Sequence, residues 1–541
     1  MVSTLRPVLV LGLDGASLDV IRPLAERGRL PNLSRWMQAG QAAPLPSTVP
    51  PMTFPSWSSF LTGLTPGEHG VFDFTQKLPG RYRIRFNNAS HRRGASLYRQ
   101  VSDAGGSVLA LGMPATFPPE PIDGLLVCGF DAPVSAGSDA SSASDPHLYR
   151  EIAERAGPWM QPDLDEAAED EAWHEQAIDV LLARIRRKTG FALEALTALR
   201  RAGRDPSLVN LVFSESDTVA HHFWRDHDPA SPRHDPGASA RRRGAIEAVY
   251  EALDASCGEL LHAFGDEATC LVVSDHGTGG AAGRVVHLNK HLETCGLLSR
   301  KGGASDLGRA ARAARDGALR LLPPRAAQAV FRKLRPAAAR LESAARFGGF
   351  DWRGTAAFSE EANTQPGVWL NLQGREEAGC IAPADLERVR RDVIDALLDW
   401  KLPSGDPVVA RARPREEVYR GPFVDRAPDI VVELALDHGY SLSLVQTPWA
   451  RQPSSVQELG ADELAGGRGR GMNGTHRPDG TWIGPREITP PASIVEVAGA
   501  IRCALGLAVD GDHGTDDLPR AYSNEEAAVL AERLRKLGYL E

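Results

Sequence analysis

The sequence predicts an α/β fold in which a mostly parallel β-sheet carries helices on both faces. Short apolar runs alternate with helical patterns along residues 1–300, which is typical of successive β-α-β units. Each run is apolar throughout, as expected for a strand that is covered on both sides. The 541 residues, 42% hydrophobic and 24% charged, suit one large elaborated domain or two to three smaller ones.

The predicted elements follow in chain order. The clearest strands of the first part are residues 8–13, 108–111, 125–128, 208–213 and 270–273. Ile246, Val249 and Leu253 lie on one apolar stripe and predict a helix over residues 246–264. A second α/β portion follows, with strands at residues 368–372 and 430–434 and a helix at 384–400. A last helix is predicted over residues 524–537.

Three stretches interrupt this pattern and predict insertions. Residues 134–170 begin with a Ser-, Ala- and Asp-rich run, and residues 226–243 contain three prolines, so both are expected to be surface loops. Residues 301–348 are rich in Ala and Arg and predict a basic helical insertion.

Composition excludes several classes of protein. Lys and Arg number 61 against 70 Asp and Glu, a net charge of −9 that argues against dedicated nucleic-acid binding. The six cysteines form no C-x-x-C pair, which favours a reducing, cytoplasmic location. The apolar run at residues 7–13 is too short for a signal peptide, and no later run approaches the roughly 18 residues of a membrane span. The oligomeric state is left open.

Acidic residues follow three of the predicted strands. Asp14 ends the first, Asp217 comes shortly after the fourth, and Asp275-His276 follows the fifth. Each could be an ordinary turn or helix cap. Together they indicate a metal site, because the carboxyl ends of parallel strands meet at one edge of a sheet.

Two histidines extend this set. His221 lies one helical turn after Asp217, so both side chains can reach the same ion. His476 follows a Gly-rich loop and is flanked like a loop ligand. The six nitrogen and oxygen donors suffice for two zinc-like ions with positions left open for a substrate.

A hydroxyl nucleophile is expected near residue 53. Pro55 suits the first turn of a helix, which places Thr53 just before the helix N-terminus, where free N–H groups attract phosphate. The alternative is a plain threonine cap, and Ser56 and Ser58 are rival hydroxyls. A threonine needs a metal ion to lower the pKa of its hydroxyl.

The sequence resembles the alkaline phosphatase superfamily, in the branch of type I phosphodiesterase/nucleotide pyrophosphatase-like proteins and the bacterial phosphohydrolase/phosphomutase group. The matching segments span positions 12–476 in the order of that family: Gly12-Leu13-Asp14-Gly15, Leu30-Pro31-Asn32-Leu33, residues 53–63, Pro66-Gly67-Glu68-His69-Gly70, residues 217–221, Ser274-Asp275-His276-Gly277 and Gly474-Thr475-His476. Residues 71–74 depart from the pattern, because nucleotide pyrophosphatases usually carry an asparagine there.

The resemblance implies a three-layer sandwich with a mostly parallel central sheet and a cap formed by insertions. It implies two divalent ions, zinc or alternatively manganese, one held by Asp14, Thr53, Asp275 and His276 and the other by Asp217, His221 and His476. Because ligands at positions 14 and 476 must meet, residues 1–300 and 349–541 are expected to form one catalytic domain, with residues 301–348 as the cap.

The leading hypothesis is a metal-dependent phosphodiesterase that acts on a small phosphate ester through a covalent phospho-threonine at Thr53. One alternative is a phosphomutase on the same two-metal core, although threonine in place of the serine usual there favours diester hydrolysis. The other is a metal-binding protein without activity, which the complete ligand set disfavours. Sulfatase chemistry is disfavoured because the nucleophile region contains no cysteine.

Overall fold

The computed structural model describes residues 5–132, 140–159, 164, 171–301, 338–450, 453–466, 470–507 and 522–536. The chain divides into two compact units. The first comprises Met1–Asp73, Asn87–Gly280 and Asn473–Ala521, and the second comprises Phe74–Phe86, Ala281–Met472 and Tyr522–Glu541. Residues 302–337, which make up most of the expected basic insertion, lie outside the described residues. The domain boundaries expected from the sequence stay a prediction.

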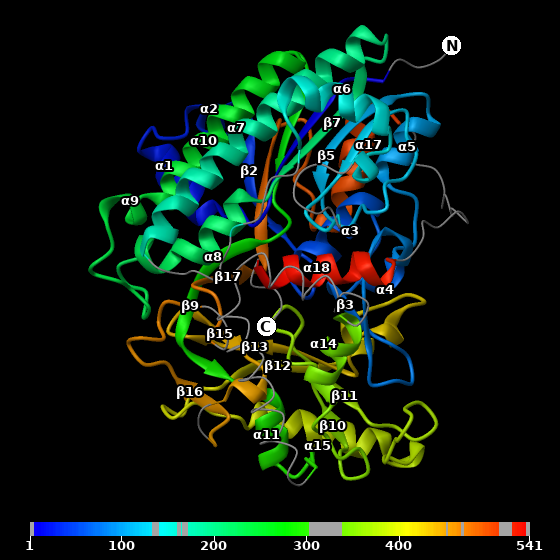
Figure 1. Ribbon diagram of the computed structural model, residues 1–541, viewed down its shortest axis with the longest axis vertical. Helices are drawn as coiled ribbons and strands as arrows, with labels where there is room; N and C mark the ends of the chain where they lie inside the picture. The colour runs from blue at the N-terminus through cyan, green and yellow to red at the C-terminus, as the bar shows by residue number, and fades with distance from the viewer. Residues whose placement is uncertain are drawn as a thin grey trace. The chain divides into compact units, whose positions relative to one another are not determined.

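Among its described residues, the first unit is organised around a seven-stranded sheet (Figure 1). The strands lie in the order β2 (Gln41–Pro46), β18 (Asp479–Gly484), β8 (Thr269–Val273), β1 (Val8–Leu13), β7 (Pro206–Phe213), β5 (Ser107–Met113) and β6 (Gly124–Cys128). Strands β8, β1, β7, β5 and β6 run parallel, whereas β18 is antiparallel to both of its neighbours. The predicted mostly parallel sheet is confirmed.

Helices cover both faces of this sheet (Figure 1). Helices α7 (Glu171–Arg201), α8 (Glu215–His227) and α10 (Ala245–Phe264) lie on one face, and α3 (Thr53–Thr62), α5 (Leu97–Asp103) and α17 (Val497–Leu505) lie on the other. Val8 and Val10 of β1 belong to the core under α3, while Leu9 and Leu11 are buried as well. Side chains of a strand alternate between its faces, so burial of all of them requires the two helical layers.

The described part of the first unit also contains shorter elements: α1 (Leu18–Glu26), α2 (Pro31–Ala39), α4 (Pro66–His69), α6 (Pro146–Ala156), α9 (Ala240–Arg243), β17 (Gly474–Arg477) and the 3₁₀ turns Ala89–His91, Ala140–Ser142 and Ile494–Glu496. Strand β17 pairs antiparallel with residues 277–280 at the start of β9 (Gly277–Val286).

Helix α6 lies inside the segment expected to be a loop insertion at residues 134–170. The Asp145 carboxylate accepts hydrogen bonds from the backbone N–H groups of His147 and Leu148, and Pro146 occupies the first helical position. Tyr149 and Ile152 are buried. The segment therefore contains a capped amphipathic helix, which the Ser- and Asp-rich run before it did not indicate.

The second unit has sheets of its own. An antiparallel sheet orders β10 (Ala357–Phe358), β11 (Gly367–Leu370), β13 (Ile430–Leu434) and β12 (Val409–Pro414). Residues 281–286 of β9 pair with β15 (Tyr440–Leu444) and β16 (Val456–Glu458), and β15 pairs with β14 (Leu436–Asp437). The other elements among its described residues are the hairpin β3 (Thr75–Lys77) and β4 (Ile84–Phe86), the helices α11 (Leu288–Thr294), α14 (Ala338–Phe347), α15 (Leu386–Leu398), α16 (Arg415–Val418) and α18 (Asn524–Lys536), and the 3₁₀ turns Pro383–Asp385, Val424–Arg426 and Thr447–Trp449.

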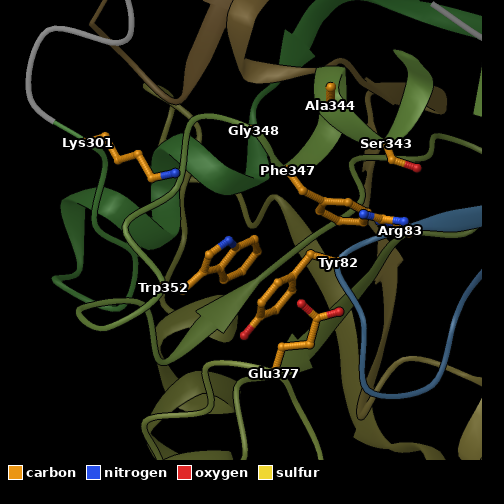
Figure 2. A pocket seen from close by; sticks show the side chains of 9 residues that line it. All are labelled: Tyr82, Arg83, Lys301, Ser343, Ala344, Phe347, Gly348, Trp352 and Glu377. Atoms are coloured by element: carbon orange, nitrogen blue, oxygen red, sulfur yellow. The ribbon is translucent and has the colours of Figure 1, made fainter. Parts of the chain in front are cut away.

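A cavity of about 360 Å³ lies in the second unit (Figure 2). The rings of Tyr82 and Trp352 line it and stack with centroids 3.4 Å apart and planes 5° apart. Lys301, Arg83 and Glu377 supply charges of both signs. None of the residues that the sequence singled out for chemistry lines this cavity.

The predicted strands and helices are found within a few residues of their expected ends. The strand expected at 270–273 is β8, the helix expected at 246–264 is α10, and the helix expected at 384–400 is α15. None of the helices in the described ranges combines the length and apolarity that crossing a membrane requires.

Candidate metal centre

Two carboxylates and a histidine meet where β1 and β8 end. Asp14 follows β1 directly, and Asp275 and His276 follow β8, its parallel neighbour. The Nε2 atom of His276 lies 3.6 Å from Asp14 Oδ1 and 3.4 Å from Asp275 Oδ2. All three side chains are buried. They form a first group that could hold a metal ion.

A second group forms between α8 and β17. The Nε2 atom of His221 lies 3.3 Å from Asp217 Oδ1 and 3.2 Å from Nε2 of His476, and His476 Nε2 lies 3.5 Å from the same oxygen of Asp217. His476 stands on β17, a strand, because its backbone pairs with β9 opposite Thr278, rather than in the loop expected from its sequence.

His276 lies close to both groups. Its ring stacks on that of His476 with centroids 3.7 Å apart, and one donor atom each of Asp217, His276 and His476 falls within a 4.8 Å cluster. The sequence assigned His276 to the Asp14 group alone. The seven side chains expected to be ligands therefore lie in one continuous site in the first unit.

The three histidines share one arrangement of hydrogen bonds. The Nδ1 atoms of His221, His276 and His476 lie 2.7, 3.0 and 3.0 Å from the backbone carbonyl oxygens of Gly474, Gly277 and Pro51. A carbonyl oxygen only accepts, so each Nδ1 carries a proton and donates it, and each Nε2 is left free of the carbonyl. Those Nε2 atoms are the ones that face the carboxylates, which is the arrangement of metal-ligating histidines.

The electrostatics of the site favour a bound cation. Burial, followed by the charges of Asp275 and Asp217, raises the pKa of Asp14 well above its usual value, and burial also raises the pKa of Asp275. Asp14 Oδ1 and Asp275 Oδ2 are buried and accept no hydrogen bond from the described part of the chain. Carboxylate oxygens oriented in this way, together with imidazole nitrogens, fit a divalent ion.

Thr53 is the first residue of α3 and is fully buried. Its Oγ1 lies 3.5 Å from Nε2 of His276, which places the hydroxyl beside the carboxylate cluster and the N–H groups of the helix N-terminus. The rival Ser56 is engaged by the hydroxyls of Ser47 and Thr48 at 2.8 and 2.9 Å. Of the candidate hydroxyls, the structure places Thr53 against a predicted ligand.

Two glycines allow the chain to pass through this site. Gly15 adopts φ of +65°, and a Cβ there would lie 2.8 Å from Oδ1 of Asp217. A Cβ at Gly474 would lie 2.3 Å from the carbonyl oxygen of Ala220, so only glycine lets β17 approach α8 this closely.

Several residues that orient the ligands escaped sequence reasoning. Trp57 donates its Nε1–H to Asp14 Oδ2 at 3.2 Å, and the Ser216 hydroxyl donates to the Asp14 carbonyl oxygen at 2.6 Å. The Gly15 N–H donates to Asp275 Oδ1 at 3.2 Å. Trp57 stands in the segment after Thr53 and Ser216 precedes Asp217, and that proximity was the only sequence signal for either.

Comparison with known proteins gives a family match over most of the chain. Residues 8–448 match the model of the family described as type I phosphodiesterase/nucleotide pyrophosphatase. No curated protein sequence matches the chain.

Solved structures similar to this one include two hydrolase structures. Phosphonoacetate hydrolase from Sinorhizobium meliloti 1021 in complex with phosphonoacetate has 15% identity and a TM-score of 0.50, covering 93% of this chain and 96% of that one. Murine ectonucleotide pyrophosphatase/phosphodiesterase 5, in an inactive form in complex with AMP, has 12% identity and a TM-score of 0.43, covering 94% and 97%. At this level of identity, the first comparison supports the fold.

Proposed function

The chain belongs to the type I phosphodiesterase/nucleotide pyrophosphatase family, and we propose that it is a two-metal phosphodiesterase with Thr53 as its nucleophile. The observation that carries the proposal is the convergence of three carboxylates and three Nε2 atoms on one site, with the Thr53 hydroxyl, at a helix N-terminus, beside His276. Phosphoester hydrolysis is the chemistry of this family. The metal ions, the diester preference and the role of Thr53 are the parts that we propose.

Each group of ligands would hold one ion. Asp14, Asp275 and His276, with Thr53 beside them, would hold the first, and Asp217, His221 and His476 would hold the second. When bound, two divalent ions of the zinc or manganese type neutralise phosphate oxygens and lower the pKa of hydroxyl and water. The hydrogen bonds from the three Nδ1 atoms to carbonyl oxygens orient each imidazole.

Thr53 would attack phosphorus in line with the leaving oxygen. As the Thr53 hydroxyl gives its proton to solvent, the bond from its Oγ1 to phosphorus forms and the bond from phosphorus to the leaving alkoxide or aryloxide breaks, and that leaving oxygen takes up a proton from solvent. Backbone N–H groups in the first turn of α3 would orient the non-bridging oxygens. A water molecule then attacks phosphorus, Thr53 leaves with its proton restored, and a phosphomonoester is released.

The test is hydrolysis of an aryl phosphodiester by purified, metal-loaded protein. Thr53→Ala should lower kcat by at least about 10³-fold, because it removes the hydroxyl that lies beside the ligands. Thr53→Ser keeps a hydroxyl and should retain measurable turnover. Mass spectrometry of quenched parent enzyme should find the arylphosphoryl group on the Thr53 peptide.

Ser58→Ala is the matched control, because Ser58 is a rival hydroxyl in the same helix that is also fully buried. It should retain parental turnover. Undiminished turnover in Thr53→Ala would overturn the nucleophile assignment, and turnover that survives complete removal of metal by chelation would overturn the two-metal reaction.

A further inference from the structure

A buried ion pair joins helices α7 and α8 in the first unit. The Lys188 amino group of α7 lies 2.9 Å from Oε1 and 3.0 Å from Oε2 of Glu215, the first residue of α8. The two side chains are 13% and 2% exposed. The amino group also lies 5.7 Å from the ring centroid of Trp159 and 5.8 Å from that of Phe213.

Such a pair needs a reason other than stability. Removing two charges from water costs about as much as their attraction returns, so apolar side chains of the same size would stabilise the fold equally well. What the pair provides is a specific position, because the carboxylate of Glu215 is held where it meets the buried amino group of Lys188. Glu215 is the first residue of α8, so α8 is the element that the ion pair positions.

Glu215 begins the helix that carries two of the three residues of the second ligand group. Asp217 lies two residues later and His221 one further turn along α8. Ser214 at the N-cap makes no capping hydrogen bond through its side chain, so the usual device for fixing a helix start is absent from α8. Ser216 ties the same turn to the carbonyl oxygen of Asp14.

We propose that Lys188 is a positioning residue for the metal centre, which through Glu215 fixes the first turn of α8 and thereby the placement of Asp217 and His221. The inference rests on the proposed function, since it concerns the affinity for the ion that those residues would hold. Loss of the ion pair between Lys188 and Glu215 should selectively lower the affinity for that ion. The group of Asp14 and Asp275 is built on β1 and β8 and should keep its ion.

The variant that tests this is Lys188→Met/Glu215→Gln, which removes both charges and keeps the shape of both side chains. Either single substitution leaves a buried charge alone and could prevent folding. Stepwise competition of a chelator with full-length protein measures the two ion affinities separately. In the variant, the affinity for the more weakly bound ion should be at least tenfold lower than the corresponding affinity of the parent. The affinity for the other ion should stay within twofold of the parental value.

A spectroscopic readout separates positioning from general loosening. With Co²⁺ as the probe ion, the visible absorption bands report ligand geometry. The variant should lose or shift the bands of one site and keep those of the other. Turnover of the variant should fall as well. At saturating metal the fall should be mainly in kcat, because Asp217 is displaced.

The matched control is a second buried pair, Lys77 and Glu376, in the second unit. Their atoms lie 2.7 Å apart with side chains 1% exposed each, and Lys77 also lies over an aromatic ring, that of Trp369. Lys77→Met/Glu376→Gln should leave both ion affinities within twofold of the parent.

The outcomes distinguish the two proposals. A parent protein that binds no ions overturns the proposed function and this inference together. A parent with two ions and a Lys188→Met/Glu215→Gln variant whose affinities are both unchanged overturns only the inference. An equal loss at both sites, or the same loss in the Lys77→Met/Glu376→Gln control, overturns it as well, since general destabilisation would then explain the effect.

Discussion

At the residue scale, the hydrogen bonds of the three histidines proposed as ligands differ from those of the buried His69. His221, His276 and His476 donate Nδ1–H to carbonyl oxygens, and their Nε2 atoms face the carboxylates of the site. His69 is arranged in the opposite way, because its Nδ1 accepts the N–H of Val71 at 3.1 Å, and its Nε2 lies 3.1 Å from the hydroxyl of Ser59. Both nitrogens of His69 are used inside the fold, as expected for a structural turn histidine.

His69 should make the stability of the first unit depend on pH. Burial and the nearby charge of Arg92 lower the pKa of His69 to about 3. The unfolded chain, with an ordinary histidine pKa, therefore takes up a proton first as the pH falls, and stability is lost progressively below about pH 6.5. From pH 7 to pH 5 the loss is about 2 kcal/mol.

The measurement is the urea midpoint of the parent and of His69→Asn at pH 7 and pH 5. Asparagine can still accept from Val71 and does not titrate, so the variant should show a smaller difference between the two pH values, whatever its stability at pH 7. Equal differences in both proteins would show that His69 is not the group responsible.

At the element scale, the site depends on the contact between α8 and β17. The Asn473 N–H donates to the His221 carbonyl oxygen at 2.9 Å, and its side-chain amide donates to the His222 carbonyl oxygen at 3.1 Å. Gly474 in turn accepts from His221 Nδ1. One close backbone approach therefore brings together His221 and His476, which are 255 residues apart.

Gly474→Ala should separate these two elements. The new Cβ would meet the carbonyl oxygen of Ala220 at 2.3 Å, and because backbone lies on both sides, β17 must move. We expect a loss of roughly 1–3 kcal/mol in unfolding free energy and a weaker second metal site. Thermal unfolding and chelator competition measure the two effects.

Gly499→Ala is the control for this substitution. Gly499 lies inside α17 and a Cβ there would contact nothing within 4 Å, so alanine should leave the metal affinity unchanged and stabilise the helix slightly. A Gly474→Ala protein that binds metal as the parent does would contradict the importance of the close approach.

At the scale of the whole molecule, the candidate metal centre joins chain segments that are far apart in sequence. The side chains that we propose as its ligands come from the ends of β1 and β8, from α3 and α8, and from β17, and all belong to the first unit. Without ions, the buried carboxylates Asp14, Asp217 and Asp275 repel one another. Metal binding should therefore stabilise the first unit by linkage.

Removal of the metal should therefore destabilise the first unit and leave the stability of the second unit unchanged. Excess chelator should increase hydrogen exchange in the first turns of α3 and α8 and in β17, whereas α15 of the second unit should exchange as before. Restoring the ion to 100 times its dissociation constant should return about 2.7 kcal/mol per site. Equal exchange with and without metal in α8 would contradict this assembly.

The sequence predicted the elements best where the deciding interactions are local. Uninterrupted apolar runs marked β1, β7 and β8, because burial on both faces shows directly in composition. Helix α10 was found from its apolar stripe. Helix α6 escaped because its cap and buried face are short and lie next to a polar run, and β17 escaped because it is a strand only through pairing with β9.

By itself, the sequence determined the chemistry of the site: which side chains can bind a cation, their order along the chain, and their positions at strand ends that a parallel sheet brings to one edge. Only the tertiary structure decided that His276 lies against both ligand groups, that Trp57 holds Asp14, and that Lys188 meets Glu215. The physical reason is that ligand types and strand burial depend on single residues and their neighbours. Tautomers, close approaches and buried ion pairs depend on atoms that folding alone brings within a few ångströms.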